Sequence, residues 1–233
     1  VYVIEASSYQ LEQSFTLSAD IAILLNIAPD HLDRHGSFAN YISAKKRLLD
    51  MQREGQVAIV SMDDEHCRKL AEPNTSRLIP ISATGPVAHG VFVQNGVLID
   101  NLENECHSVA TQGEWPALQG AHNAQNVAAA SAAARLLGLS WKVIRQGLQS
   151  YQSLPHRMEP LGQLSQVAFY NDSKATNPDA AARAIMAFEK VHWIAGGIAK
   201  SEDLGALAGA TAHISKAYLI AVSYTHLRAH ETR

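Results

Sequence analysis

Cysteine is scarce in this chain, and long apolar runs are absent. The 233 residues include two cysteines, Cys67 and Cys106, which lie far apart and form no C-x-x-C pair. This spacing argues against a structural zinc site or a disulfide framework, and it fits a reducing, cytoplasmic compartment. The longest apolar stretches, residues 21–27 and 127–134, are too short to cross a bilayer, and no charged leader opens the chain.

An excess of basic charge is also missing. The formal net charge is -3, whereas a general nucleic-acid binder is usually basic, although a local basic pocket for phosphates stays compatible with this value. The sequence contains no G-x-x-x-x-G-K-[ST] motif, the loop whose backbone N–H groups cradle nucleotide phosphates. What is present is an ordinary globular composition, 47% hydrophobic and 18% charged.

Apolar runs of strand length alternate with helical patterns along the chain. The predicted strands cover residues 1–5, 21–27, 56–61, 91–93, 97–99, 167–171, 191–195 and 217–221. The predicted helices cover residues 38–51, 63–70, 122–137, 140–148, 179–188 and 204–213. Asn95-Gly96 between two β-branched runs predicts a tight hairpin. The alternation predicts an α/β fold with mainly parallel sheets.

Polar residues follow the first two predicted strands. Glu5 ends one strand, and Asp30, His31 and Asp33 follow the next. Ligands collect at the carboxyl ends of strands in open α/β sheets, and oxygen-rich groups there suit Mg²⁺ or Mn²⁺. The plainer alternative is that Glu5 and Asp30 cap helices.

Further polar segments could also bind ligands. Asn123 and Asn126 share one helix face and could read an adenine edge, although Asn123 could instead be a helix cap. Arg157, after Leu154-Pro155, is suited to phosphate. Residues 171–177 place many polar side chains in one strand-end loop, which favours a site there. Lys45 on a basic helix, and Lys200 after Gly196-Gly197, are weak signals alone.

Taken together, these segments resemble the Mur ligase family. Residues 5–12, Glu-Ala-Ser-Ser-Tyr-Gln-Leu-Glu, match its E-x-S-S-[FY]-Q-L-E segment, and residues 26–33 match its N-x-x-x-D-H-x-D segment. Residues 154–157 and 171–177 match its L-P-H-R and N-D-S-K-A-T-N segments. Order and spacing agree over residues 1–220, and the first and third segments point to the members that add D-glutamate.

The resemblance implies a domain organisation. Residues 1–153 correspond to the later part of the central ATPase domain, and residues 154–221 to the start of a truncated Rossmann-like C-terminal domain. The N-terminal UDP-binding domain and the phosphate loop have no counterpart in this sequence, so we expect a fragment without ligase activity of its own. Residues 222–233, polar and without periodicity, are expected to be a non-native tail, or else a natural flexible one.

The resemblance also implies a reaction and its residues. ATP and Mg²⁺ would activate the carboxyl group of UDP-N-acetylmuramoyl-L-alanine as an acyl phosphate, which the D-glutamate amine attacks during peptidoglycan precursor synthesis. The metal-holding residues would be Glu5, His31 and Lys45, the last as a carbamate. Catalytic roles would fall on Lys45, His31, Lys174 and Lys200. Nucleotide contacts would come from Asn123, Asn126, Arg157 and Asp172, and substrate contacts from Ser7, Gln10, His156, Thr176 and Lys200. A cytoplasmic monomer with no nucleic-acid partner is expected.

The sequence is also compatible with two other functions. One is another amide ligase of the superfamily, either a diaminopimelate- or lysine-adding enzyme or a folylpolyglutamate synthase. The other is a non-catalytic α/β module that binds a nucleotide.

Overall fold

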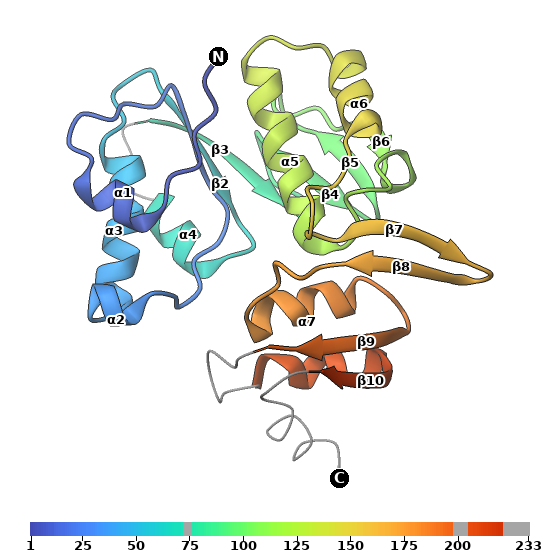
Figure 1. Cartoon of the computed structure of the whole chain (residues 1–233). Coiled ribbons are helices and arrows are strands. Elements are labelled where there is room, and N and C mark those ends of the chain that lie inside the picture. Colours follow the sequence, from blue (N-terminus) through green and yellow to red (C-terminus); the bar gives the residue numbers. More distant parts are fainter. Residues whose placement is uncertain (72–75, 198–204, 221–233) are drawn as a thin grey trace. The chain divides into compact units, whose positions relative to one another are not determined.

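The computed structural model describes residues 1–71, 76–197 and 205–220. The chain divides into two compact units, which are described separately (Figure 1). Unit 1 comprises Val1–Glu114 and Asn123–Gln149, and unit 2 comprises Trp115–His122 and the chain from Ser150 onward. The predicted α/β class is confirmed in both units.

A six-stranded sheet forms the centre of unit 1, with its strands in sequence order. The strands are β1 (Ile21–Leu24), β2 (Val57–Ser61), β3 (Arg77–Ser82), β4 (Val91–Gln94), β5 (Val97–Asp100) and β6 (His107–Thr111). Strands β1 to β4 pair in parallel, and β5 pairs antiparallel with both β4 and β6, so the sheet is mixed. Asn95 and Gly96 both have positive φ, 51° and 73°, as the predicted hairpin turn between β4 and β5 requires.

Helices complete unit 1. They are α1 (Ser8–Gln13), α2 (Leu32–His35), α3 (Phe38–Asp50), α4 (Glu65–Ala71), α5 (Ala121–Leu136) and α6 (Trp141–Ser150), with a 3₁₀ turn at Gln112–Glu114. The first two residues of α5 and the last residue of α6 fall in unit 2. The predicted helix over 38–51 is confirmed as α3, whose buried residues Tyr41, Ala44 and Leu49 lie at helical spacing. Its apolar face joins β1, β2 and α4 in one core cluster.

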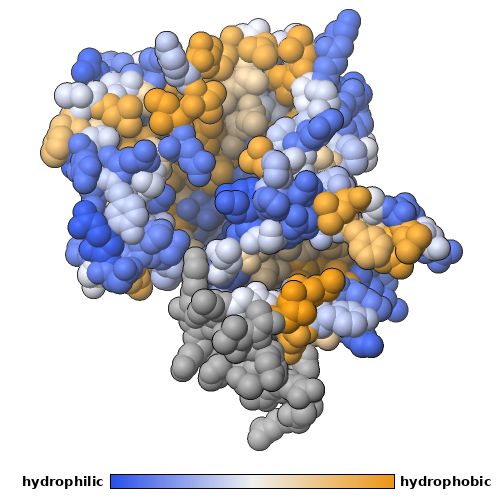
Figure 2. Space-filling model, in the orientation of Figure 1, coloured by the Kyte–Doolittle hydropathy of each residue, from blue (hydrophilic) through white to orange (hydrophobic). Residues whose placement is uncertain are grey.

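Among the described residues, unit 2 has fewer helices and strands than unit 1. It contains the antiparallel pair β7 (Glu159–Leu164) and β8 (Val167–Asn171), helix α7 (Pro178–Met186), the parallel pair β9 (Val191–Gly196) and β10 (Ile214–Ile220), and a 3₁₀ helix at Gly205–His213. Ala182, Ile185, Leu207 and Ala210 form its buried cluster. Figure 2 shows apolar side chains exposed along the β7–β8 hairpin.

The predicted strand over residues 1–5 is wrong. Val1, Tyr2 and Val3 are at least 95% exposed, and residues 1–6 carry no regular structure. The β-branched composition is typical of a strand, but a strand is held by ladder hydrogen bonds to a neighbour, and no described strand pairs with this segment.

Two other elements near the C-terminus differ from expectation. The helix predicted over 204–213 is a 3₁₀ helix from Gly205, and the last strand begins at Ile214 instead of Ala217. The expected tail, residues 222–233, lies outside the described residues.

Candidate functional site

A cavity of about 300 Å³ opens beside the first turn of α1. Three segments that are distant in sequence form its walls: the stretch leading into α1, the loop after β1, and α3. The lining residues are Glu5, Ala6, Ser7, Ser8, Gln10, Asp30, His31, Tyr41 and Lys45. The predicted residues Glu5, Ser7, Gln10, His31 and Lys45 are therefore brought together in one place.

Ser7 and Gln10 form the capping box of α1. The Ser7 hydroxyl accepts a hydrogen bond from the Gln10 N–H at 3.3 Å, and the Gln10 side-chain oxygen accepts one from the Ser7 N–H at 2.8 Å. This reciprocal arrangement satisfies two backbone donors that a helix start leaves free. The cap belongs to Ser7, so the alternative that Glu5 caps this helix is wrong.

His31 has a backbone conformation that is uncommon for a residue with a side chain. Its φ of 51° lies in the left-handed region, and its backbone N–H donates to the Asp30 carboxylate at 2.9 Å. The His31 ring lies 5.1 Å from the Tyr9 ring, centroid to centroid. Asp30 holds this turn, but no side chain caps α2, so Asp30 is not a helix cap. Such strain in a cavity wall is typical of functional loops.

Lys45 is half-buried on α3. Its ammonium lies 5.7 Å from the centre of the Tyr41 ring. Burial lowers the pKa of Lys45, while the charges of Asp30 and Glu5 act in the opposite direction without cancelling it. Burial, followed by the charge of Asp30, raises the pKa of Tyr41. Lys45 is therefore an amine with an increased neutral fraction, next to two carboxylates.

A divalent cation would need more ligands than the unmodified side chains of this cavity provide. Within the described residues, no group of three or more His, Cys, Asp or Glu side chains has an arrangement that could hold a metal ion. Glu5 and His31 lie on the cavity wall, and Lys45 faces them as a cation or a neutral amine. An additional anionic group on Lys45 would supply the missing oxygen ligand.

The predicted nucleotide contacts, Asn123 and Asn126, lie in the first turns of α5. The Asn126 amide donates to the Asn123 side-chain oxygen at 3.2 Å, so the two share one face as expected. Because α5 begins at Ala121, Asn123 is not its cap. Gln125, between them in sequence, donates to the Ser61 hydroxyl at 2.8 Å and accepts from the Asn26 amide at 3.4 Å.

Asp63 anchors a hydrogen-bond network that the sequence reasoning missed. Its carboxylate accepts from the Ser82 and Thr84 hydroxyls at 2.6 and 2.7 Å and from the Ala83 N–H at 2.7 Å. Burial alone would raise the pKa of Asp63, but these hydrogen bonds, with one from Gln125, hold it below its ordinary value of 3.8. Polar residues after the strands over 57–61 and 77–82 carried the same strand-end signal as Asp30 and His31 after β1.

In unit 2, the predicted residues His156, Asp172 and Lys174 lie close together. The backbone N–H of Lys174 donates to the His156 carbonyl at 3.0 Å, and the Asp172 carboxylate accepts from the Met158 N–H at 3.0 Å. The His156 ring lies 2.8 Å from the Asn171 amide nitrogen, and His156 has a φ of 66°. The strand-end loop and the Leu-Pro-His-Arg segment thus form one polar surface.

The remaining predicted site residues of unit 2 are Arg157, Thr176 and Lys200. Arg157 and Thr176 are both exposed and join the chain locally through backbone hydrogen bonds, to Leu154 and Lys174. Lys200 lies outside the described residues. His122, a residue not predicted, is partly buried; burial and the charge of Arg183 lower its pKa, while the charge of Asp172 acts in the opposite direction.

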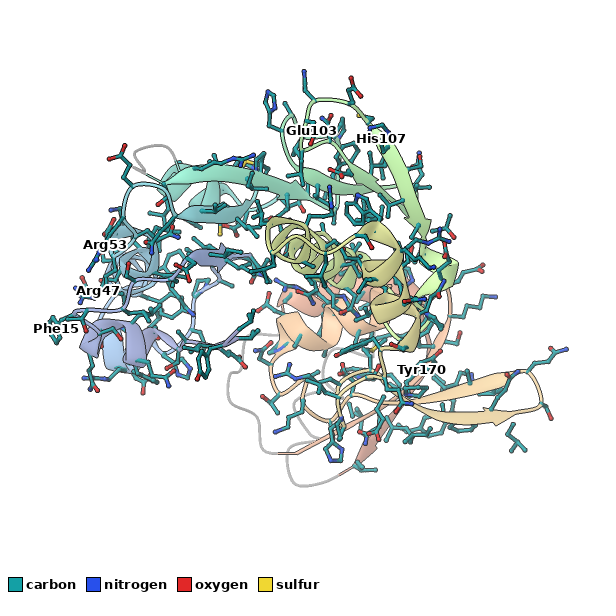
Figure 3. The ribbon with its side chains drawn as sticks, turned by 90° about the horizontal axis from the view of Figure 1, so that it is seen from above. Phe15, Arg47, Arg53, Glu103, His107 and Tyr170 are labelled. Carbon is teal, nitrogen blue, oxygen red and sulfur yellow. The ribbon has the colours of Figure 1, made fainter. Side chains whose placement is uncertain are left out.

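A second cavity, of about 470 Å³, lies between β6 and α6 and contains none of the predicted residues. Its lining includes His107, which Figure 3 labels, together with Trp141 and Arg145. Arg145 donates to Glu114 at 2.6 Å, so its charge is already paired. Volume alone does not make a site. The larger cavity is lined by His107, Lys142 and Arg145 without a carboxylate, whereas the smaller one combines Glu5 and Asp30 with His31 and Lys45.

Comparison with known proteins identifies the family of this chain. The family model for the Mur ligase middle domain matches residues 1–134, more than half of the chain. This chain belongs to the Mur ligase family. It is 44% identical over 224 residues to the UDP-N-acetylmuramoylalanine--D-glutamate ligase of Caulobacter vibrioides (strain NA1000 / CB15N), and 42% identical over 224 residues to that of Phenylobacterium zucineum (strain HLK1). Each match covers 94% of this chain and 48% of the relative, so the chain spans about half the length of these Mur ligases.

Solved structures of Mur ligases share the fold. MurF from Acinetobacter baumannii aligns with a TM-score of 0.62 at 20% identity, over 91% of this chain and 54% of that one. MurF ligase from Thermotoga maritima, solved in complex with ADP, aligns with a TM-score of 0.61 at 18% identity, over 92% and 55%. At these identities the likeness concerns the fold alone. Among the described residues of this chain, no helix is long and apolar enough to span a membrane.

Proposed function

We propose that the protein to which this chain belongs is an ATP-dependent ligase that joins D-glutamate to UDP-N-acetylmuramoyl-L-alanine in peptidoglycan precursor synthesis. The observation that carries the proposal is the cavity that gathers Glu5, His31 and Lys45 with the capping box of α1. The relatives with 42–44% identity are named as this ligase, which supports the choice of amino acid. A cytoplasmic location and a monomeric state are part of the proposal.

Lys45 is proposed to act as a carbamate. A neutral amine attacks carbon dioxide and an ammonium does not, so the lowered pKa of Lys45 favours the modification. The carbamate would be an anion beside Glu5 and His31, and the three would then hold Mg²⁺. When bound, Mg²⁺ neutralises the charge that develops on the transferred phosphoryl group.

The other groups are proposed to bind and orient substrates. Asn123 and Asn126 would contact the nucleotide base from α5, where their amides can both donate and accept. Arg157 and Asp172 would contact phosphate and ribose, and His156, Lys174, Thr176 and Lys200 would face the incoming amino acid or the acyl phosphate. Ser7 and Gln10 would orient the acceptor through the free face of the capping box.

A chimera tests the proposal. Residues 1–220 of this chain would replace the matching segment of the Caulobacter vibrioides ligase, which supplies the parts that this sequence lacks, including a phosphate-binding loop. Phosphate release with ATP and UDP-N-acetylmuramoyl-L-alanine would be measured against D-glutamate, diaminopimelate, lysine and L-glutamate. We expect D-glutamate to be preferred. A preference for another amino acid would assign a different ligase, and a folded chimera that binds nucleotide without turnover would favour the non-catalytic module.

A further inference from the structure

A buried imidazole contacts two residues of the cavity lining, Ser8 and Tyr41. His35, the last residue of α2, has a side chain that is 0% exposed. One ring nitrogen, Nδ1, is 3.0 Å from the Glu12 carboxylate, and the other, Nε2, is 3.0 Å from the Ser8 hydroxyl. A fully buried histidine with both nitrogens engaged has a fixed orientation, because any rotation would leave a buried polar atom without a partner.

The chemistry of its two partners, the Glu12 carboxylate and the Ser8 hydroxyl, determines which ring nitrogen of His35 carries the proton. An ionised carboxylate only accepts, so Nδ1 must donate to Glu12. In the neutral imidazole Nε2 then accepts from the Ser8 hydroxyl. The order hydroxyl, imidazole, carboxylate is also that of serine hydrolases, but Ser8 is 3% exposed and its hydroxyl is directed at a buried ring. This burial favours a role in holding structure over one as a nucleophile.

Two aromatic rings fix the plane of His35. Tyr9 stacks on it, with ring centroids 5.6 Å apart and planes 10° from parallel, and Tyr41 meets it edge-on at 5.3 Å. Tyr9 belongs to α1 and Tyr41 to α3, so the imidazole joins both helices. Tyr41 in turn lies under the Lys45 ammonium. A continuous series of contacts thus runs from Glu12 through His35 and Tyr41 to Lys45.

The C-terminal end of α1 is held by Arg47, a residue of α3. Arg47 donates to the Leu11 carbonyl at 2.8 Å and also to the Ser14 carbonyl, and its guanidinium lies 5.4 Å from the Phe15 ring centre. Figure 3 shows Arg47 and Phe15 near each other at the outer side of unit 1. Arg47 therefore fixes the C-terminal end of α1, and His35 fixes the end that faces the cavity.

We propose that Ser8, His35 and Glu12 form a hydrogen-bonded relay around the buried His35, in which His35 is a positioning residue, holding the first turn of α1 against α3 so that Ser7, Gln10 and Lys45 face one another across the cavity. His35 itself touches no substrate in this proposal. Its importance for ligation rests on the function proposed above, whereas the relay can be tested in the chain alone.

The first test is spectroscopic and uses the full 233-residue chain labelled with ¹⁵N-histidine. We expect His35 in the Nδ1-protonated form, with a slowly exchanging ring proton that disappears in Glu12→Gln, whose amide no longer fixes the tautomer. An Nε2-protonated His35, or a ring proton that exchanges as fast as those of exposed histidines, would overturn the relay.

The second test separates hydrogen bonds from ring packing. His35→Phe keeps an aromatic ring between Tyr9 and Tyr41 but removes both hydrogen bonds. We expect the amide of Leu11, which donates to the Ser7 carbonyl, to exchange with deuterium about tenfold faster, while amides of α4 are unchanged. The matched control is His66→Phe, since His66 also meets an aromatic ring edge-on, that of Phe38.

Unchanged protection of Leu11 in a folded His35→Phe variant would contradict the proposal and assign His35 to packing alone. If His35→Phe does not fold, Ser8→Ala keeps the ring and removes a single hydrogen bond, and the same comparison applies. In the chimera, Ser8→Ala should raise the KM for the acceptor and leave the KM for ATP unchanged. An inactive parent chimera would refute the proposed function but not the relay, which the chain alone reports.

Discussion

Strands β2 and β9 have similar apolar composition but very different burial. In β2 the residues from Ala58 to Ser61 are all buried, whereas in β9 burial alternates along the strand and Ile194 is 66% exposed. β2 has a hydrogen-bonded strand on each side, β1 and β3, while β9 pairs only with β10 among the described strands. Burial of a strand therefore depends on its neighbours, and the apolar pattern alone does not determine it.

The largest expected effect is a loss of folding stability, and it should differ between an isoleucine of β2 and one of β9. Ile59 of β2 is 0% exposed, so Ile59→Ala removes buried methyl groups and leaves a void. We expect a loss of about 3 kcal/mol in the free energy of unfolding. Ile194→Ala in β9 should change it by less than about 0.5 kcal/mol. Urea unfolding monitored separately in the two units would measure both, and equal losses would remove the distinction between the strands.

A smaller effect is expected at Gly90, just before β4. A Cβ at this position would lie 1.9 Å from the Pro80 carbonyl oxygen, so the backbone of β3 or β4 must move. We expect Gly90→Ala to cost about 2 kcal/mol. Gly85→Ala is the matched control because nothing lies within 4 Å of its Cβ position. Similar thermal midpoints for the two variants would show that the strands adjust without cost.

The pH dependence of folding stability should also differ between the two units. The pKa of His122 in unit 2 is lowered from 6.5, so the unfolded chain binds the proton more readily than the folded one. Stability from His122 is complete above pH 6.5 and is lost as the pH falls through the lowered pKa of the folded state. Thermal unfolding of unit 2 between pH 7.5 and 5 should show this decline, and His122→Gln should flatten it. An unchanged slope in His122→Gln would assign the decline to other groups.

The smallest expected effect is on the stability of unit 1, through a carboxylate that titrates at lower pH than His122. The lowered pKa of Asp63 stabilises the folded state above pH 3.8, and this contribution is lost as the pH falls through the still lower folded value. Thr84→Val removes one of the hydrogen bonds that lower this pKa and should reduce stability at pH 7 by about 1 kcal/mol, with less difference at pH 3. A loss that is equal at both pH values would show that Asp63 is not responsible.

The sequence predicted the fold well where a pattern depends on near neighbours along the chain. The hairpin at Asn95-Gly96 and the amphipathic helix α3 are examples, because turn chemistry and helical periodicity are local. Residues 1–5 were mispredicted since their composition fits a strand but the ladder partner is a matter of tertiary structure. Helix α1 was missed although Ser7 and Gln10 carry a capping-box spacing, because only six residues follow the cap.

The candidate site was predictable to a similar degree. Motif order grouped Glu5, His31 and Lys45, and the three residues line one cavity, although Glu5 does not follow a strand as expected. Their roles as metal ligands remain a proposal. Asp63 and Gln125 were missed because their partners are far away in sequence, and His35 was missed because a histidine next to a glycine gives no sign of being buried.

The proposed function depends most on Lys45 acting as an anionic group in the cavity. Lys45→Ala in the chimera should reduce D-glutamate ligation by about 100-fold, and acetate or propionate should restore part of the rate by supplying a carboxylate at the vacated position. Lys46→Ala is the control, since Lys46 is the next lysine on α3 and pairs with Asp50. A Lys45→Ala chimera that ligates at the parent rate, or whose lost activity is not restored by short carboxylic acids, would show that Lys45 does not act as an anionic group.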